Sequence, residues 1–198
     1  LAEGEYRVRN LYVSFDPAMR GWMDDRPSYI PPVQIGEVMR AGAVGQVVES
    51  RHPDFEVGDF VQGLFGWQDY SDAGTGLNQG TKLPPGTSLT WPLGVLGITG
   101  LTAYFGLLDL GVPQKGETVV VSGASGATGS VAAQIARIKG CTVVGIAGGA
   151  EKCAWLTGEA RLDAAIDYKS EDVGQRLGEL CPQGIDVYFD NVGGPILD

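Results

Sequence analysis

The sequence predicts a two-domain α/β protein, with a β-rich first domain and a doubly wound parallel sheet in the second. At 198 residues, 43% of them hydrophobic, the chain can bury the cores of two small domains. Residues 1–92 contain short strand patterns between glycine-rich turns, which is typical of small β domains. From residue 93 onward, apolar strands alternate with helical patterns, which indicates a parallel sheet with helices on both faces.

Short strands of alternating polarity indicate the β-rich domain. The segment EYRVRNLYVS at 5–14 has apolar residues at Tyr6 and Val8 and then at Leu11 and Val13. Two further runs, GQVVES at 45–50 and GDFVQGLF at 58–65, flank the turn RHPDFEVGD. Strands this short and this closely spaced predict a small barrel or sandwich.

The second domain is predicted to begin with a buried helix pair or one long helix over 93–110. Four apolar runs then predict parallel strands, at 118–122, 142–147, 164–167 and 186–190. Helices are expected between them, at 127–139, 150–156 and near 173–180. In the first of these helices Val131, Ile135 and Ile138 form an apolar stripe with Ala132 and Ala136 beside it, which we expect to pack on the sheet.

A glycine-rich turn joins the first parallel strand to its helix. The segment VSGASGATGS at 121–130 places Gly123, Gly126 and Gly129 at equal spacing. Glycine allows a tight turn, close approach of the backbone to a ligand and close packing of the helix. The helix beyond it begins with unpaired N–H groups and a partial positive charge, which together can bind a diphosphate. The turn therefore predicts a dinucleotide site, the alternative being a tight turn without a ligand.

The end of the second strand favours NADP(H) over NAD(H). An NAD enzyme usually carries Asp or Glu here to bind the ribose 2′-hydroxyl, whereas this chain reads AGGAEK over 147–152. Ala147 and Gly148 offer no carboxylate that would repel a 2′-phosphate, and Lys152 can supply a positive charge. Glu151 is adjacent but lies about 100° away around the helix, since a helix turns once every 3.6 residues. Lys152 could also be an ordinary solvated lysine.

Composition excludes several other classes of protein. The formal net charge of −10 argues against nucleic acid or an anionic membrane as a partner. The three cysteines and the single histidine, His52, lack metal-ligand spacing, so we expect no metal site and reduced thiols, as in a cytoplasmic protein. The most apolar window, 93–108, is too short and too interrupted by glycine to span a bilayer. No secretory signal pattern is visible in the sequence.

Several stretches spread over the chain carry a resemblance to a known family: SFDPAMRGWM, PSYIPPVQIGEVM, GWQDY, GVLGITGLTAYFGLLDLG, KGCTVVGIAGGAEKC and IDVYFDNVGG. In them the chain resembles the zinc-independent medium-chain dehydrogenases/reductases, in the group of leukotriene B4 dehydrogenases/prostaglandin reductases and plant alkenal reductases. It most resembles the bacterial NADPH-dependent curcumin reductases. The resemblance implies a GroES-like catalytic domain over 1–92 and an NADP-binding Rossmann domain over 93–198. It also implies further strands at both ends, so we expect the chain to be truncated there.

The resemblance further implies a set of cofactor-contacting residues: Thr102, Gly126, Ala127, Thr128, Gly129, Gly148, Lys152, Tyr168 and Asn191. In the family the glycine turn binds the diphosphate, the lysine binds the 2′-phosphate and the tyrosine lies beside it. The asparagine contacts the cofactor and the threonine lies near the nicotinamide. Structural roles remain open for three of these residues. Tyr168 could cover the sheet edge, Asn191 could cap a helix, and Thr102 could pack inside one.

The activity implied by the resemblance is hydride transfer from NADPH to the β-carbon of an α,β-unsaturated ketone or aldehyde, with no metal. Negative charge then builds on the carbonyl oxygen, and a hydroxyl group can donate to it. Tyr29 matches a family tyrosine placed toward the substrate and is the predicted catalytic residue, although it could be an ordinary loop aromatic; Tyr70 is a weaker candidate.

One departure from the family keeps other functions open. The family motif DPYMR reads DPAMR here, so Ala18 removes a hydroxyl that relatives place near the active site. A catalytically silent NADPH-binding relative is therefore one alternative. A quinone reductase of the same superfamily is another, because it shares the glycine turn and the chemistry of the strand end. The family also implies a homodimer acting on a small molecule.

Overall fold

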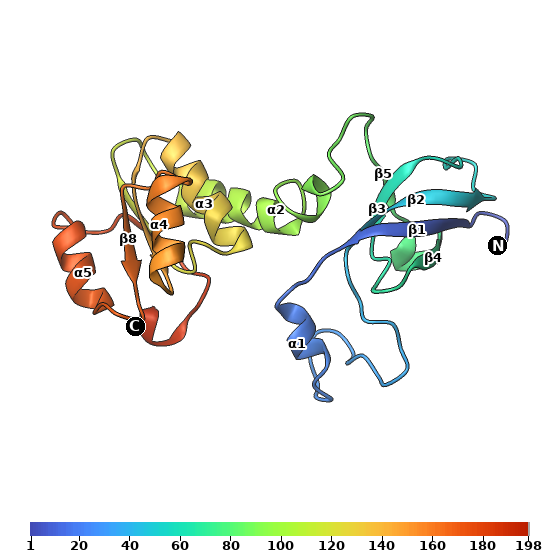
Figure 1. The fold of residues 1–198 in the computed structure, drawn as a ribbon, viewed down its shortest axis with the longest axis horizontal. Helices are drawn as coiled ribbons and strands as arrows, with labels where there is room; N and C mark the ends of the chain where they lie inside the picture. The colour runs from blue at the N-terminus through green and yellow to red at the C-terminus, as the bar shows by residue number, and fades with distance from the viewer. Residues whose placement is uncertain (198) are drawn as a thin grey trace. The chain divides into compact units, whose positions relative to one another are not determined.

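The chain forms two compact units, Leu1–Leu93 and Gly94–Asp198. The structure is a computed structural model and describes residues 1–197. Figure 1 shows strands and loops in the first unit and a repeating succession of strands and helices in the second. The expected succession of a β-rich part and a parallel-sheet part is therefore confirmed.

The first unit is built on one antiparallel five-stranded sheet with the order β4-β1-β2-β3-β5. Its strands are β1 (Tyr6–Val13), β2 (Ala43–Ser50), β3 (Phe60–Gly63), β4 (Tyr70–Ala73) and β5 (Thr81–Lys82). A short helix, α1 (Ala18–Trp22), follows β1, and two 3₁₀ turns, η1 (Gly76–Asn78) and η2 (Trp91–Leu93), lie near the end of the unit.

Strand β1 changes its buried face partway along its length. Tyr6 and Val8 are fully buried, whereas Leu11 and Val13 are exposed. The register against β2 shifts between Asn10 and Tyr12, so a bulge turns the second half of the strand away from the core. The strand stays paired with β2 through Val13, and the chain then enters the segment that carries α1.

The second unit contains a parallel four-stranded sheet with the order β8-β7-β6-β9. Its strands are β6 (Thr118–Val121), β7 (Thr142–Ala147), β8 (Ala164–Asp167) and β9 (Val187–Phe189). The connecting helices are α3 (Ala127–Ile138), α4 (Ala150–Gly158) and α5 (Val173–Leu180), and a 3₁₀ turn, η4 (Gly194–Ile196), follows β9. Each predicted strand and helix of this series is present within two residues of its expected ends.

Both faces of this sheet are apolar because successive side chains of a strand point to opposite sides. On one face Val119, Val121 and Val143 belong to the core that also holds α3 and α4 residues. On the other face Val120, Val144, Ile146 and Ile166 pack with side chains of α5. Figure 1 shows the same division, with α3 and α4 on one side of β8 and α5 on the other. The predicted doubly wound sheet is confirmed.

The strand order defines where this unit can bind a ligand. The chain runs from β6 outward to β7 and β8 and then crosses back to place β9 on the other side of β6. The winding direction therefore reverses between β6 and β9. In open α/β sheets, ligands bind outside the carboxyl ends of the strands at this reversal.

Helix α3 packs on the sheet mainly through its small residues. Its buried residues are Gly129, Ala132, Ala133 and Ala136, and Ile135 packs partly buried against the same core, whereas Ile138 is 83% exposed. The expected apolar stripe is therefore wrong at Ile138. Small side chains let the helix axis lie close to the strands, so alanine, rather than the bulkier residues, occupies the contact.

The segment 93–110 contains one helix, but that helix is only partly buried. Helix α2 (Ile98–Phe105) continues into a π-helical turn, η3 (Gly106–Gly111), so the expectation of one long helix holds in shortened form. Gly100, Ala103 and Leu107 are buried, whereas Ile98 and Leu110 are 71% and 84% exposed. The expectation of a fully buried segment was wrong: α2 contacts α3, but only these three residues of the segment are buried within α2 and η3.

Candidate functional site

Most of the predicted cofactor-binding residues lie at the carboxyl edge of the parallel sheet. The glycine turn follows β6, Gly148 and Lys152 follow β7, Tyr168 follows β8, and Asn191 follows β9. Main-chain hydrogen bonds join these strand ends: Ala124 N–H donates to the Ile146 carbonyl at 3.0 Å, and Tyr168 N–H to the Ala147 carbonyl at 3.1 Å. Segments that are far apart in the sequence are thereby brought to one edge.

The glycine turn ends in an uncapped helix. Gly126 is the N-cap of α3, and no side chain accepts a hydrogen bond from the first turn. The N–H groups of Ala127, Thr128 and Gly129 point out of the helix end, where the intrahelical ladder offers them no acceptor. An added Cβ at Gly129 would lie 2.4 Å from the Gly123 carbonyl oxygen, so this close packing of turn and helix requires glycine. The helix end fits an anion with several oxygens, such as a diphosphate.

The end of β7 has no room for a side chain. An added Cβ at Gly148 would lie 2.8 Å from the ring and hydroxyl of Tyr168, so the ring covers this part of the backbone. The next residue, Gly149, has φ of +104°, a conformation that L-residues rarely adopt. Lys152 is exposed in the first turn of α4. The strand end therefore presents backbone and a nearby cation, as the NADP(H) prediction requires.

Asp167, which sequence reasoning missed, ties the turn after β7 to the turn after β8. Its carboxylate accepts hydrogen bonds from the N–H groups of Gly149 at 2.7 Å and Lys169 at 3.1 Å. The Ser170 hydroxyl donates to the same carboxylate at 3.0 Å. These donors, with Gly149 the largest contributor, hold the pKa of the Asp167 carboxyl below its usual range. The carboxylate thus fixes the approach of Tyr168 to the glycines of the β7 turn.

Asn191 lies on the other side of β6, at the reversal of the winding direction. Its side-chain amide donates to the Ser122 carbonyl at 2.9 Å, and its main-chain N–H donates to the Ser122 hydroxyl at 2.8 Å. The Ser122 hydroxyl in turn donates to Asp190 at 2.7 Å. Sequence reasoning identified Asn191 but missed Ser122 and Asp190, because no motif links residues that far apart.

Thr102 is engaged within its own helix. Its hydroxyl donates to the Ile98 carbonyl at 2.7 Å, one turn earlier in α2. The side chain is exposed, so it is available to a ligand only if this local bond is shared. Its role near a nicotinamide stays a prediction.

Tyr29, the predicted catalytic residue, lies in the loop that follows α1 in the first unit. Its ring is 83% exposed, and its hydroxyl oxygen accepts a hydrogen bond from the Trp22 indole N–H at 3.0 Å. Because the hydroxyl oxygen is the acceptor, its own proton remains available for donation to another group. Sequence reasoning missed Trp22. Ala18, where the family has a tyrosine, is the exposed first residue of α1.

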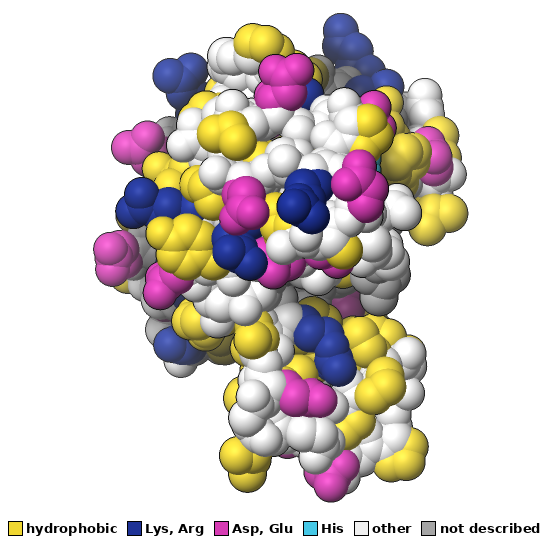
Figure 2. Space-filling model, turned by 90° about the vertical axis from the view of Figure 1, so that its right-hand side faces the viewer, with side chains coloured by type: hydrophobic (Ala, Val, Ile, Leu, Met, Phe, Trp, Pro, Cys, Tyr) yellow, Lys and Arg dark blue, Asp and Glu magenta, His cyan; other side chains and the backbone are white. Residues whose placement is uncertain are grey.

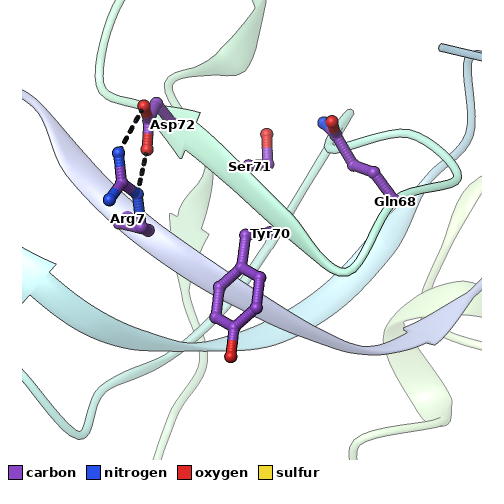
Figure 3. Close-up of a pocket in the computed structure, with 5 residues that line it drawn as sticks. All are labelled: Arg7, Gln68, Tyr70, Ser71 and Asp72. Carbon is purple, nitrogen blue, oxygen red and sulfur yellow. Dashed lines mark hydrogen bonds and ion pairs between the residues drawn. The ribbon is translucent and has the colours of Figure 1, made fainter.

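A pocket in the first unit contains no predicted site residue except the weaker candidate Tyr70. It has a volume of about 480 Å³ and is lined by Arg7, Gln68, Tyr70, Ser71 and Asp72 (Figure 3). The guanidinium of Arg7 donates twice to Asp72, at 2.7 and 2.9 Å, so the two charges in this pocket neutralise each other. We therefore assign the pocket no chemistry.

The described residues 1–197 offer neither a metal-ligand cluster nor a membrane span. No three His, Cys, Asp or Glu side chains among them gather in a group that could hold a metal ion. No helix in this part of the chain is long and apolar enough to cross a membrane. On the face shown in Figure 2, acidic and basic side chains are interspersed among hydrophobic ones.

Two family models match the chain. The model described as the N-terminal domain of oxidoreductase matches residues 1–79, and the model described as zinc-binding dehydrogenase matches residues 127–198. Among curated relatives, the NADPH-dependent curcumin reductase of Escherichia coli is 50% identical over 197 residues, covering 99% of this chain and 56% of that protein. Prostaglandin reductase 1 of Bos taurus is 41% identical over 202 residues, covering 98% of this chain and 57% of that protein.

A solved structure shares the fold of both units. The crystal structure of CurA from Vibrio vulnificus in complex with NADPH is similar to this chain with a TM-score of 0.92 and 47% sequence identity. The similarity covers 100% of this chain and 58% of that one. The chain thus spans a little over half the length of the relatives that it matches.

The lowered pKa of Asp167 leads to a prediction about stability in acid. Because the folded-state pKa lies below that of the unfolded chain, the stabilisation is present above about pH 4 and is lost as pH falls through the folded-state pKa. We expect the Asp167→Asn variant to be less stable than the wild type at pH 7 and to approach it in acid. Urea unfolding between pH 3 and pH 7, in steps of about one unit, measures this difference.

The exposed Asp25, changed to Asn, provides the control for the loss of one negative charge. A constant offset between the Asp167→Asn variant and the wild type over the whole pH range would contradict the prediction.

Proposed function

The chain belongs to the medium-chain dehydrogenase/reductase family, close to the curcumin reductases, and from this premise we propose that the whole protein is an NADPH-dependent enone reductase. It reduces the C=C bond of α,β-unsaturated ketones and aldehydes. The observation that carries the proposal is the edge of the parallel sheet, where an uncapped helix end lies beside a strand end with no carboxylate. The NADPH dependence named for the relatives and the NADPH bound in the similar structure support it.

The donors at this edge fit NADPH. The main-chain N–H groups at the start of α3 would hold the diphosphate, which explains how a protein of net charge −10 binds an anion without a basic cluster. Lys152 would hold the 2′-phosphate, with the ring of Tyr168 over Gly148 as the adjacent wall. Thr102 and Asn191 would contact the nicotinamide half.

The chemistry divides between the cofactor and the protein. NADPH, when bound, supplies the hydride that adds to the β-carbon. The Tyr29 hydroxyl donates a hydrogen bond to the carbonyl oxygen, where negative charge develops during the reaction. The Trp22 N–H bond orients this hydroxyl and strengthens it as a donor, because hydrogen bonds in a chain polarise one another. The α-carbon of the enolate then takes a proton from solvent, which gives the saturated carbonyl product.

Two further proposals concern the location and the oligomeric state of the whole protein. We propose that it acts in the cytoplasm, which agrees with three free cysteines. We also propose that it is a homodimer, as implied by the resemblance to the reductase family. Its substrate would be a small conjugated carbonyl compound.

A substrate panel tests the proposed activity. The whole protein is assayed with enones, alkenals and quinones, each with NADPH and with NADH, by following the loss of dinucleotide absorbance. We expect enones and alkenals to be reduced, with a higher kcat/KM for NADPH than for NADH. Reduction of quinones alone would favour the quinone reductase instead, and tight NADPH binding without turnover of any substrate would indicate a silent binding protein.

Lys152 tests the choice of cofactor. We expect Lys152→Ala to raise the KM for NADPH by about 10- to 100-fold, the effect of losing one charged hydrogen bond, and to leave the KM for NADH nearly unchanged. Lys139→Ala is the matched control, because Lys139 is an exposed lysine at the opposite end of α3. Equal changes for both dinucleotides in Lys152→Ala would remove this residue from the 2′-phosphate site.

Tyr29 tests the catalytic assignment. We expect Tyr29→Phe to lower kcat for enone reduction by about 100-fold, the effect of losing one hydrogen-bond donor to the developing oxyanion, while the dissociation constant for NADPH stays the same. Steady-state kinetics and a fluorescence titration with NADPH measure the two quantities. Tyr12→Phe, at an exposed tyrosine on β1, controls for loss of a phenol. An unchanged kcat would exclude Tyr29 from the mechanism.

A further inference from the structure

Strands β6 and β9 are tied together at both ends by carboxylates. Asp186 precedes β9 and accepts a hydrogen bond from the Thr118 N–H, at the amino end of β6, at 2.8 Å. Asp190 follows β9 and accepts from the Ser122 hydroxyl, at the carboxyl end of β6, at 2.7 Å. The two ties join the same pair of strands, but only the second lies at the edge where parallel sheets bind ligands.

The Ser122–Asp190 bond at the carboxyl edge also fixes the segment that follows β9. The Ser122 hydroxyl is fully buried, and it accepts the Asn191 N–H at 2.8 Å while donating to Asp190. The Asp190 carboxylate also accepts the N–H groups of Val192 at 3.2 Å and Gly193 at 2.8 Å. The Ser122 hydroxyl, the Asp190 carboxylate and the three main-chain N–H groups thus all have partners, so the segment 190–193 is held in one conformation.

The fixed segment packs directly on the glycine turn. An added Cβ at Gly123 would lie 3.5 Å from the Asn191 Cβ and 3.4 Å from a methyl group of Val192. Asn191 is exposed, and its amide group donates to the Ser122 carbonyl, which turns its oxygen away from that bond. Within residues 1–197 no hydrogen bond is donated to this oxygen, so it can accept one from a ligand hydroxyl or amide.

The strand order indicates which half of a dinucleotide meets this segment. The end of β7, with Gly148 and Lys152, lies on one side of β6, and β9 lies on the other. If the diphosphate is bound at the end of β6 and the 2′-phosphate at the end of β7, the remaining half of the cofactor extends toward β9.

We propose that Ser122 and Asp190 form a positioning pair, which holds Asn191 and the turn after it in the conformation that receives the ribose–nicotinamide half of the dinucleotide. The inference rests on the proposed function and adds two residues that act through Asn191. The ionised form of Asp190 serves this role, since the Ser122 hydroxyl first, and then the Val192 and Gly193 N–H groups, lower the pKa of its carboxyl.

The experiment compares dinucleotide affinity with stability in the whole protein. We expect Ser122→Ala to raise the dissociation constants of NADPH and NADH alike, by about 10-fold, because the half shared by the two dinucleotides is held less well. Fluorescence titration gives both constants, and thermal unfolding of the same samples gives Tm. The equal effect on both cofactors separates this variant from Lys152→Ala, for which only NADPH binding should weaken.

Asp186→Ala is the matched control, since it removes a carboxylate tie between the same two strands at the opposite edge. We expect it to lower Tm without changing either dissociation constant. If Ser122→Ala also lowers Tm while both constants stay at their wild-type values, the pair is structural only and the proposal is overturned. If the wild type itself binds neither dinucleotide, the proposed function falls together with the pair.

A second single variant keeps the test decisive if Ser122→Ala folds poorly. Asp190→Asn preserves the size of the side chain but removes its charge, and we expect it to raise the dissociation constants of both dinucleotides. Where Ser122→Ala folds, the double variant should lose no more affinity than the weaker-binding single variant, because both changes act on the same bond: Asp190→Asn weakens it by removing the charge, and Ser122→Ala removes its donor. Losses that add independently would overturn the pairing.

Discussion

The parallel pairing of β6 with β7 on one side and β9 on the other is the constraint on which the candidate site depends. Parallel strands bring their carboxyl ends to one edge, and the reversal of winding between β6 and β9 leaves that edge open between two sets of helices. The turns after β6, β7, β8 and β9 therefore meet although long helical connections separate them. Without this pairing, the glycine turn would be only a flexible loop before α3.

Carboxylates at the rims of the sheet are used as acceptors for the protein's own donors. Asp163 accepts the Val143 N–H at 2.7 Å, and Asp167, Asp186 and Asp190 make corresponding bonds at other strand ends. Each bond offsets part of a negative charge by a main-chain dipole. An excess of acidic residues is therefore compatible with an edge that presents unpaired N–H groups to an anion, because some of that excess is engaged within the fold.

Sequence patterns predicted the parallel sheet well, because strands covered on both faces read as continuous apolar runs such as Thr118–Val121 and Thr142–Ala147. They failed for the end of α3, where Ile138 is exposed while alanines at 132, 133 and 136 meet the sheet, since hydrophobicity alone does not say how near a helix lies. The glycine turn and the strand end at Gly148 were readable from local chemistry. Ser122 and Asp190 were not, because their bond joins residues 68 positions apart and each is an ordinary polar residue by itself.

The two glycines after β7 also constrain how this chain could evolve another coenzyme preference. An acidic side chain at position 148 would collide with the phenol ring of Tyr168, and one at position 149 would force an L-residue into a left-handed backbone. Under the proposed assignment, a single substitution at either glycine is therefore a poor route toward NADH. A change of preference would first require a smaller side chain in place of Tyr168. That intermediate protein would lose the contact of the ring with the adenosine half of the cofactor before the new acidic side chain could bind the ribose.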